Sequence, residues 1–304
     1  MGKETEKIFK DFSKYVEENS DANRTEADMR NMINEFIAKY NSNLPLKVTP
    51  KTAKSSDDYL ELAYDADNLN DALKYAKEAL KLDPNNFDAE ALLIEIKTIG
   101  STKRVRDYAK AVERATAYLE KEGYFEEHCI GAFWGLVETR PYMRLRGKYL
   151  NSLIECGMIG QAKEECEELL RLCEGDNLGI RYKLMHILAY FEDEEAAITL
   201  HKRFDSFDET QMLLPLSVLY YKKGNYTKAT QYLRKLNKVN KDLKRFMKMF
   251  ISGNDDMFEG YGLDGGYRPG TMEELMIELE ENGFFFVGAI TYMEWALEQI
   301  KKFK

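Results

Sequence analysis

A short segment rich in arginine contains the side chains best suited to bind a ligand. Arg140 and Arg144 lie one helical turn apart, and Lys148 and Asn151 follow along the same segment. A guanidinium group is planar and binds a carboxylate or a phosphate through two parallel hydrogen bonds. The segment therefore favours an acidic peptide, or the carboxylate at the end of a chain, as its ligand.

Residues for catalysis or metal binding form no recognisable motif. The glycine-rich stretch 260–270 lacks the Lys-Ser/Thr ending of a phosphate-binding loop and follows no hydrophobic strand. A zinc site needs four ligands at short paired spacings, whereas Cys129, Cys156, Cys166 and Cys173 contain no CxxC pair. We therefore expect a non-catalytic protein with no metal, no cofactor and reduced, mostly buried thiols.

The overall composition excludes several classes of protein. The chain has 304 residues and a formal net charge of −9, with 44% apolar and 32% charged residues. Proteins that bind duplex nucleic acid usually carry a positive balance, because phosphate contacts supply much of their affinity. No apolar stretch approaches the roughly 18 residues of a membrane span, and the amino terminus lacks the apolar core of a signal peptide. We therefore expect a cytoplasmic protein that binds neither nucleic acid nor membranes.

The elements that must position the arginine-rich segment are predicted to be helices. Only 6 prolines occur, and long runs are rich in Glu, Lys, Ala and Leu, which favours helix over sheet. The clearest unit is 58–86, where a helix, a short turn and a second helix are followed by a proline. Ala72 and Ala79 would let the two helices approach closely. Pro84 would end the second helix, because proline lacks the N–H that the hydrogen-bond ladder requires.

Similar units recur along the chain. One spans 143–176 and another begins at Thr210, while weaker units fill 87–123 and 177–209. Ala162 and Ala229 occupy equivalent positions, separated by close to two repeats of about 34 residues. The intervening unit is therefore expected to continue the same register.

This register resembles the tetratricopeptide repeat family over roughly residues 53–242. The resemblance implies an all-α protein, a right-handed α-solenoid of helix pairs with atypical terminal caps. In that family the first helix of each pair lines a concave groove, and Arg144, Asn151 and Arg181 fall at groove positions here. The groove would change along the chain from acidic through basic to apolar and aromatic. Its other positions include Asp57, Glu61, Tyr64, Gln211, Pro215, Val218 and Tyr221.

A narrower resemblance involves the run FWGLVETRPYMRLR at 133–146 and the run DNLGIRY at 176–182. Both are similar to motifs of uncharacterised prokaryotic tetratricopeptide proteins that are related to the suppressor-of-tumorigenicity-seven family. That family has no established activity, so the resemblance implies a fold and no reaction. The motifs single out Glu138, Arg140, Tyr142, Arg144, Asn177, Gly179 and Arg181.

The sequence therefore predicts a non-catalytic protein–protein interaction module or scaffold that binds an extended peptide, with acidic peptides favoured, in the concave groove. The alternative is a sensor of a small acidic ligand or a short signalling peptide bound between repeats. A structural role for the arginines also stays open, in which they pair with Glu138 and Glu155 and hold adjacent repeats in register. The predicted binding residues are Arg140, Arg144, Lys148, Asn151, Arg181, Tyr142 and Glu138.

The ends of the chain differ from the repeats and are expected to cap the array. The predicted divisions are an N-terminal helical cap at 1–44, a linker at 45–55, the repeat array at 56–242 with an extra helical segment near 124–140, and a C-terminal helical cap at 243–304. In the first cap, Ile8, Phe12 and Tyr15 mark one amphipathic helix.

Two features mark the C-terminal cap. Thr271 and Glu274 have the spacing of a capping box, which predicts that a helix begins there. The aromatic run 284–286 is expected to seal the last helix, and its alternative role is to join two copies of the chain. We therefore expect a monomer or a weak homodimer.

Overall fold

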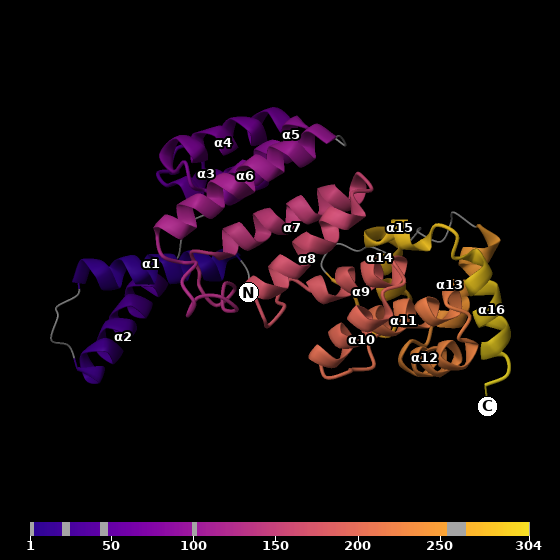
Figure 1. The fold of residues 1–304 in the computed structure, drawn as a ribbon. Helices are drawn as coiled ribbons and strands as arrows, with labels where there is room; N and C mark the ends of the chain where they lie inside the picture. The colour runs from indigo at the N-terminus through magenta and orange to yellow at the C-terminus, as the bar shows by residue number, and fades with distance from the viewer. Residues whose placement is uncertain (1–2, 20–24, 43–47, 99–101, 254–265, 304) are drawn as a thin grey trace. The chain divides into compact units, whose positions relative to one another are not determined.

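The computed structural model describes residues 3–19, 25–42, 48–98, 102–253 and 266–303. Every regular element within these residues is an α-helix, so the prediction of an all-α protein is confirmed (Figure 1). None of the described helices combines the length and the apolar character needed to cross a membrane. All four cysteines are free thiols.

The chain divides into two compact units, Met1–Ser152 and Leu153–Lys304. The boundary lies within the segment 56–242 that the sequence analysis treats as one array. The helices that begin in the first unit are α1 (Lys3–Asn19), α2 (Glu26–Ser42), α3 (Ser56–Tyr64), α4 (Leu69–Leu82), α5 (Phe87–Lys97), α6 (Thr102–Lys121) and α7 (Arg140–Glu155). The last of these, α7, ends in the second unit.

The helices α3 and α4 pack together as the sequence predicts. Leu60 of α3 contacts Ala79 of α4 and Ala89 of α5, and both alanines are fully buried. Small side chains let the helices approach, and the larger apolar side chains fill the remaining space. α4 ends at Leu82, two residues before Pro84.

Polar contacts hold the first turns of α3 and α5 close together. Ser56 Oγ donates a hydrogen bond to the backbone oxygen of Ala79 at 2.9 Å, and the side-chain amide of Asn86 donates to Ser56 Oγ at 2.8 Å. Asn86 also caps α5, because its Oδ1 accepts a hydrogen bond from the N–H of Ala89 at 3.0 Å. Asn86 and Ser56 together therefore link α3, α4 and α5.

Residues 122–139 form turns and bends and contain no helix, so the extra helical segment predicted near 124–140 is wrong for that stretch. Gly123 and Gly131 have φ angles of 83° and 89°, which lie outside helical geometry. Phe133 is fully buried among other aromatic rings of the unit. The segment is thus an irregular connection anchored by its own aromatic side chain.

The second unit contains the remaining helices, and α11 lies at its centre. These helices are α8 (Ile159–Leu172), α9 (Ile180–Tyr190), α10 (Glu194–Arg203), α11 (Thr210–Lys222), α12 (Tyr226–Val239), α13 (Leu243–Ser252), α14 (Met272–Glu281), α15 (Gly283–Phe286) and α16 (Ile290–Ile300). Every residue of α11 from Thr210 to Tyr220 is buried. α11 packs against α9, α12 and α14, which explains why it is buried on all sides and mostly apolar.

The C-terminal segment covers the positions of α11 that the sequence analysis assigns to the groove. Gln211 is buried, and its side-chain amide donates a hydrogen bond to the hydroxyl of Tyr267 at 2.6 Å. The ring of Tyr221 lies against the rings of Tyr292 and Trp295, with centroid distances of 5.5 and 5.1 Å. The expectation that these positions face an open groove is therefore wrong, because the chain itself occupies the space.

α14 begins where the sequence predicts, but the capping box does not form. Thr271 Oγ1 donates a hydrogen bond to a backbone carbonyl, while the Glu274 carboxylate accepts one from the N–H of Gly270 at 2.7 Å. The first-turn N–H of Met272 donates instead to Asp242 at 3.0 Å. The start of α14 is thus held by a contact with Asp242 and by a bond from Gly270 instead of by a capping box.

The aromatic run 284–286 contributes to the core of the second unit. Phe285 and Phe286 are buried, and Phe285 meets the ring of His186 edge-on at a centroid distance of 5.0 Å. Burial lowers the pKa of His186 to about 4, because the charged imidazolium would lose its hydration. His186 is therefore a neutral core residue.

Candidate functional site

Helix α1 has a charged stripe on the side opposite to its apolar stripe. Glu6, Lys7 and Lys10 follow the spacing i, i+1, i+4, which places them on one side of a helix with 3.6 residues per turn. On the other side, Phe12 and Tyr15 pack against a ring of α2, Phe36, with centroid distances of 5.1 and 5.6 Å. The apolar stripe is therefore directed to α2, and the charged stripe is left for other partners.

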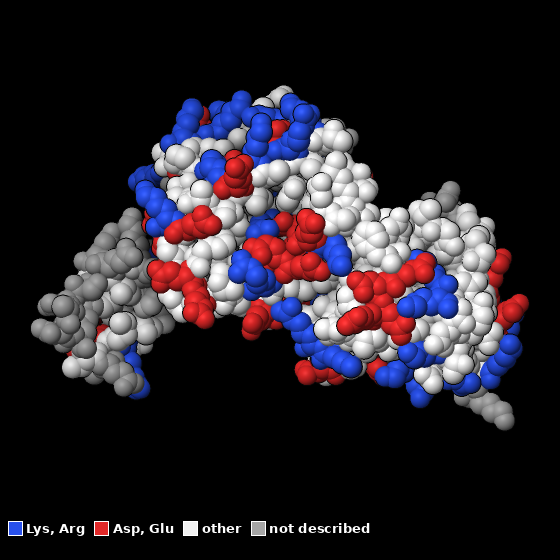
Figure 2. Space-filling model, viewed as in Figure 1, with Lys and Arg blue, Asp and Glu red and all other residues white. Residues whose placement is uncertain are grey.

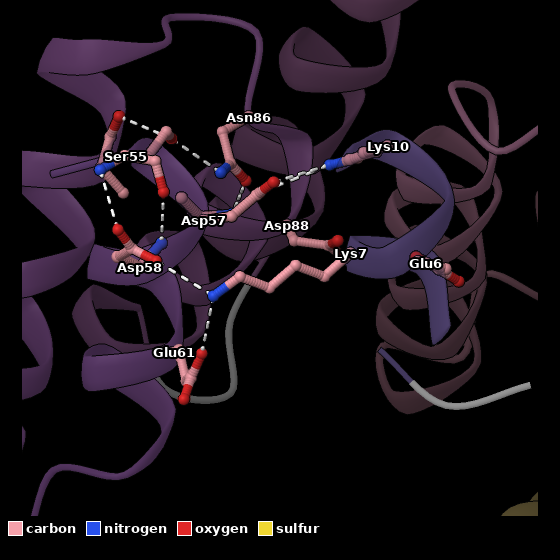
Figure 3. A network of polar contacts seen from close by, with 12 residues as sticks. Glu6, Lys7, Lys10, Ser55, Asp57, Asp58, Glu61, Asn86 and Asp88 are labelled. Atoms are coloured by element: carbon pink, nitrogen blue, oxygen red, sulfur yellow. Dashed lines mark hydrogen bonds and ion pairs between the residues drawn. The ribbon is translucent and has the colours of Figure 1, made fainter. Parts of the chain in front are cut away.

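The two lysines of the charged stripe bind carboxylates at the start of α3. Lys7 Nζ lies 3.0 Å from Asp58 and 3.4 Å from Glu61, and Lys10 Nζ lies 3.1 Å from Asp57 (Figure 3). Asp57 and Glu61 are two of the positions that the sequence analysis assigns to an acidic part of the groove. In the structure, the ammonium groups of Lys7 and Lys10, from the same chain, are paired with these two carboxylates.

The acidic member of the stripe binds the arginine-rich segment. Both oxygens of Glu6 accept hydrogen bonds from Arg144, at 2.8 and 3.0 Å, and one of them lies 3.8 Å from Arg140. Arg144 also donates to both oxygens of Asp88 on α5, at 2.8 and 2.6 Å. Burial by itself would lower the pKa of Arg144, but its hydrogen bonds and attraction to Asp88 and Glu6 prevail and raise it.

We use the term charged face for the residues of α3, α5 and α7 that surround this stripe. Its members are Asp57, Asp58, Glu61, Asp88, Arg140 and Arg144. The pairs on this face bury their groups to different degrees, since the side chains of Glu6 and Arg144 are 7% and 19% exposed whereas those of Lys10 and Asp57 are 40% and 37% exposed. The contact with α7 is therefore the most desolvated part of the face.

The carboxylate of Asp58 is fixed by the local structure of α3 as well as by Lys7. Ser55 and Asp58 form a capping box at the start of this helix. Partial burial raises the pKa of Asp58, but the N–H groups of Lys54 and Ser55 and the ammonium group of Lys7 outweigh it and lower that pKa to about 2. Because the pKa is lowered by folding, this carboxylate adds stability above about pH 4 that is lost as the pH falls towards 2.

Replacing Ser55 with alanine is expected to lower the free energy of unfolding by about 1 kcal/mol. The substitution removes the Oγ that accepts a hydrogen bond from the N–H of Asp58 at 3.1 Å. Urea denaturation followed by circular dichroism at pH 7 measures the change. A loss below about 0.3 kcal/mol would contradict the role assigned to this cap.

The other residues predicted for the site near α7 have different environments. Tyr142 is fully buried, and its hydroxyl lies 2.7 Å from Thr116 Oγ1. Lys148 is bonded to Glu95 of α5. Glu138 and Asn151 are exposed. Only Arg140 and Arg144 among the predicted residues thus belong to the charged face.

Arg181 belongs to the second unit and has carboxylate partners there. Its guanidinium lies 3.0 Å from Asp176 and 3.3 Å from Glu209, and its carbon atom Cζ stands 4.2 Å from the centre of the Tyr182 ring. Asp176 also accepts hydrogen bonds from the first N–H groups of α9, including that of Ile180 at 2.6 Å. This arginine therefore connects the start of α9 to the residue before α11. A ligand-binding role for it stays a prediction.

Sequence reasoning missed the three residues of the charged stripe. It assigned the helix to a cap from its apolar residues Ile8, Phe12 and Tyr15, and gave the opposite side no role. The order Glu6, Lys7, Lys10 is complementary to Arg144 and to the acidic start of α3, and that complementarity is the signal that was present. It becomes visible only when the two segments are known to lie together.

An open cleft of about 1120 Å³ lies between α10 and α12 in the second unit. Glu194 on its wall pairs with Lys223 at 2.8 Å and with Lys228 at 3.1 Å, and these hydrogen bonds lower the pKa of Glu194 to about 2. Lys228 also stands 4.6 Å from the centre of the Tyr220 ring. Both acidic and basic side chains line the cleft, and side chains of both signs also lie close together on the face of the molecule shown in Figure 2. The cleft therefore favours no single sign of ligand charge.

In the described part of the chain, His, Cys, Asp and Glu side chains form no group of three or more that could hold a metal ion. Comparison with models of known protein families gives no match, and comparison with curated proteins gives none either. The contacts of the charged face are therefore the basis for assigning a function.

Proposed function

We propose that this chain is a non-catalytic protein interaction module, built as a right-handed solenoid of tetratricopeptide-like helix pairs, whose charged face binds a helical peptide segment of a partner. The single observation that carries the proposal is the seating of the charged stripe of α1 on α3, α5 and α7 through complementary ion pairs. α3 and α5 each pack against the helix that follows them, α4 and α6, and α7 is the first helix of the next predicted unit. In a tetratricopeptide-like array, the first helices of the pairs line the concave side.

The distribution of charge supports a peptide ligand over a small acidic one. The charged face presents carboxylates on α3 and guanidinium groups on α7, and one turn of α1 uses both. A small carboxylate would need only the arginines, and the guanidinium of Arg144 is already bonded to Asp88. A helix with charges of both signs therefore satisfies more of the face than a small anion does.

The test uses affinity purification of the tagged full chain from its native host with mass spectrometry, comparing the wild type with Asp57→Lys/Glu61→Lys. Reversing two carboxylates on the charged face is expected to remove the partners that the wild type enriches. Glu113→Lys/Glu120→Lys is the matched control, because both of these glutamates are exposed on α6 and the change in net charge is the same. Equal enrichment by all three proteins would count against the proposal.

A sensor of a small ligand is the second candidate, and the cleft between α10 and α12 is the observation that favours it. The cleft lies between helices of two neighbouring pairs, where the sequence analysis places such a ligand. Thermal-shift measurements with a panel of acidic metabolites and short acidic peptides test it. A ligand that raises the melting temperature of the wild type but not of Lys228→Glu would support this candidate, and the absence of any shift would remove it.

A further inference from the structure

We infer that α1 is an exchangeable occupant of the charged face, and that the partner which replaces it is an amphipathic helix with the same charge order: an acidic residue, a lysine directly after it, and a second lysine three positions later. This inference rests on the proposed function and adds the chemistry of the partner and the regulation of the site. In α1 the order is Glu6-Lys7-Ile8-Phe9-Lys10.

The first support is the kind of contact that holds the charged stripe. The three residues of the stripe reach the charged face through ion pairs, while the rings of Phe12 and Tyr15 pack on α2. Phe9, between the two lysines, is 43% exposed. Salt screens ion pairs of this kind, and the partly exposed pairs of Lys7 and Lys10 contribute little individually, whereas any helix that replaces α1 must reproduce the more desolvated contact of Glu6. A helix held mainly by such pairs can exchange with another helix that repeats them.

The second support is that the charged face keeps its internal bonds when α1 leaves. Arg144 retains two hydrogen bonds to Asp88. Asp58 retains those from the N–H groups of Lys54 and Ser55, each at 3.0 Å. The most buried charges of the face are therefore not left unpaired. An unpaired buried charge would make the departure of α1 costly. The face is organised for a helix before any helix binds.

The third support is the covalent connection of α1 to the face that it occupies. Residues 20–55 connect α1 to α3 in the sequence, so α1 competes as a tethered ligand. A tethered segment competes at an effective concentration that is set by the length and stiffness of its connection. A free peptide with the sequence of α1 should consequently bind the wild-type chain weakly, although its contacts are the same.

The experiment measures binding of a fluorescein-labelled peptide of residues 3–19 to the full-length chain by anisotropy, in low salt. Lys7→Glu/Lys10→Glu places negative charges opposite Asp57, Asp58 and Glu61, which repels the tethered α1. This variant is expected to bind the labelled peptide at least about tenfold more tightly than the wild type. Lys244→Glu/Lys248→Glu on α13 is the control with the same change in net charge, and it is expected to match the wild type.

A second part of the experiment exchanges the charges of α3 with those of the peptide. Asp57→Lys/Glu61→Lys is expected to lose the labelled peptide and to bind a peptide with glutamate at the two lysine positions. Adding Lys7→Glu/Lys10→Glu to that chain restores attraction within the molecule, so binding of the swapped peptide is expected to weaken again by about tenfold. Circular dichroism and the melting temperature of each variant confirm that the fold is retained.

The outcomes separate this inference from the proposed function. If Lys7→Glu/Lys10→Glu binds the peptide no more tightly than the wild type, α1 is not an exchangeable occupant and the inference fails. If, in that case, Asp57→Lys/Glu61→Lys still loses the native partners, the proposed function is retained and only the inference about α1 is rejected. If the charge reversals on α3 change neither peptide binding nor partner capture, the proposed function and the inference about α1 are both overturned.

Discussion

Replacing Arg144 with methionine is expected to lower the free energy of unfolding by about 3 kcal/mol, the largest loss that we predict for a single substitution in the first unit. The guanidinium makes four hydrogen bonds to Glu6 and Asp88. Methionine preserves most of the apolar contact but removes all four hydrogen bonds to two largely buried carboxylates, and Glu6 then retains only the more distant Arg140, at 3.8 Å, from the charged face. Thermal and urea denaturation at pH 7, followed by circular dichroism, measure the loss.

Arg171→Met is the matched control for this prediction. Arg171 also pairs with a carboxylate, that of Glu168 on the same helix, but the two side chains are 50% and 28% exposed. Exposed pairs of this kind contribute less than about 1 kcal/mol, because water solvates both partners when the pair is broken. A loss for Arg144→Met no greater than that for Arg171→Met would show that the charged face does not depend on this arginine.

Replacing Glu278 with methionine is expected to raise the free energy of unfolding at pH 7 by about 2 kcal/mol. Glu278 is fully buried on α14, and neither of its carboxyl oxygens has a hydrogen-bond partner among the described residues. Methionine has a similar length and no group that needs hydration. The variant should therefore unfold at a higher temperature and a higher urea concentration than the wild type.

The gain in the free energy of unfolding of Glu278→Met over the wild type should increase with pH. Burial, together with the charge of Glu274, raises the pKa of Glu278 well above its ordinary value. Below about pH 4 the carboxyl is protonated in both the folded and the unfolded chain, so ionisation adds no penalty. Above that pH the unfolded chain releases its proton while the folded chain retains it, which destabilises the wild type progressively. The difference in stability between variant and wild type is therefore expected to be smallest near pH 4.

Glu280→Met is the control, since Glu280 lies on the same helix and is exposed. Its substitution should change stability by less than about 0.5 kcal/mol at any pH in this range. Equal effects at the two positions, or a gain for Glu278→Met that does not depend on pH, would contradict the interpretation of Glu278 as a buried carboxyl without partners.

The local elements of this protein could be predicted because they depend on neighbouring residues. Ala79 and Pro84 indicated where α3 and α4 approach and where α4 ends, and the structure agrees. The start of α14 was also predicted, although its capping contacts were not, because Asp242 lies 30 positions from Met272 and no local pattern contains that contact. Helix formation depends on periodicity and local hydrogen bonds, and both can be read over a few turns.

The sequence by itself predicted that the chain is all-helical and that Asp57, Glu61 and Arg144 lie on first helices of helix pairs, and the structure confirms the helices. Only the tertiary structure decided what meets those charges. Arg144 and Glu6 are 138 positions apart, and nothing in the spacing of either segment relates one to the other. An ion pair needs both partners in place, so its existence depends on the path of the whole chain, whereas the helix that presents each partner depends on its own few turns.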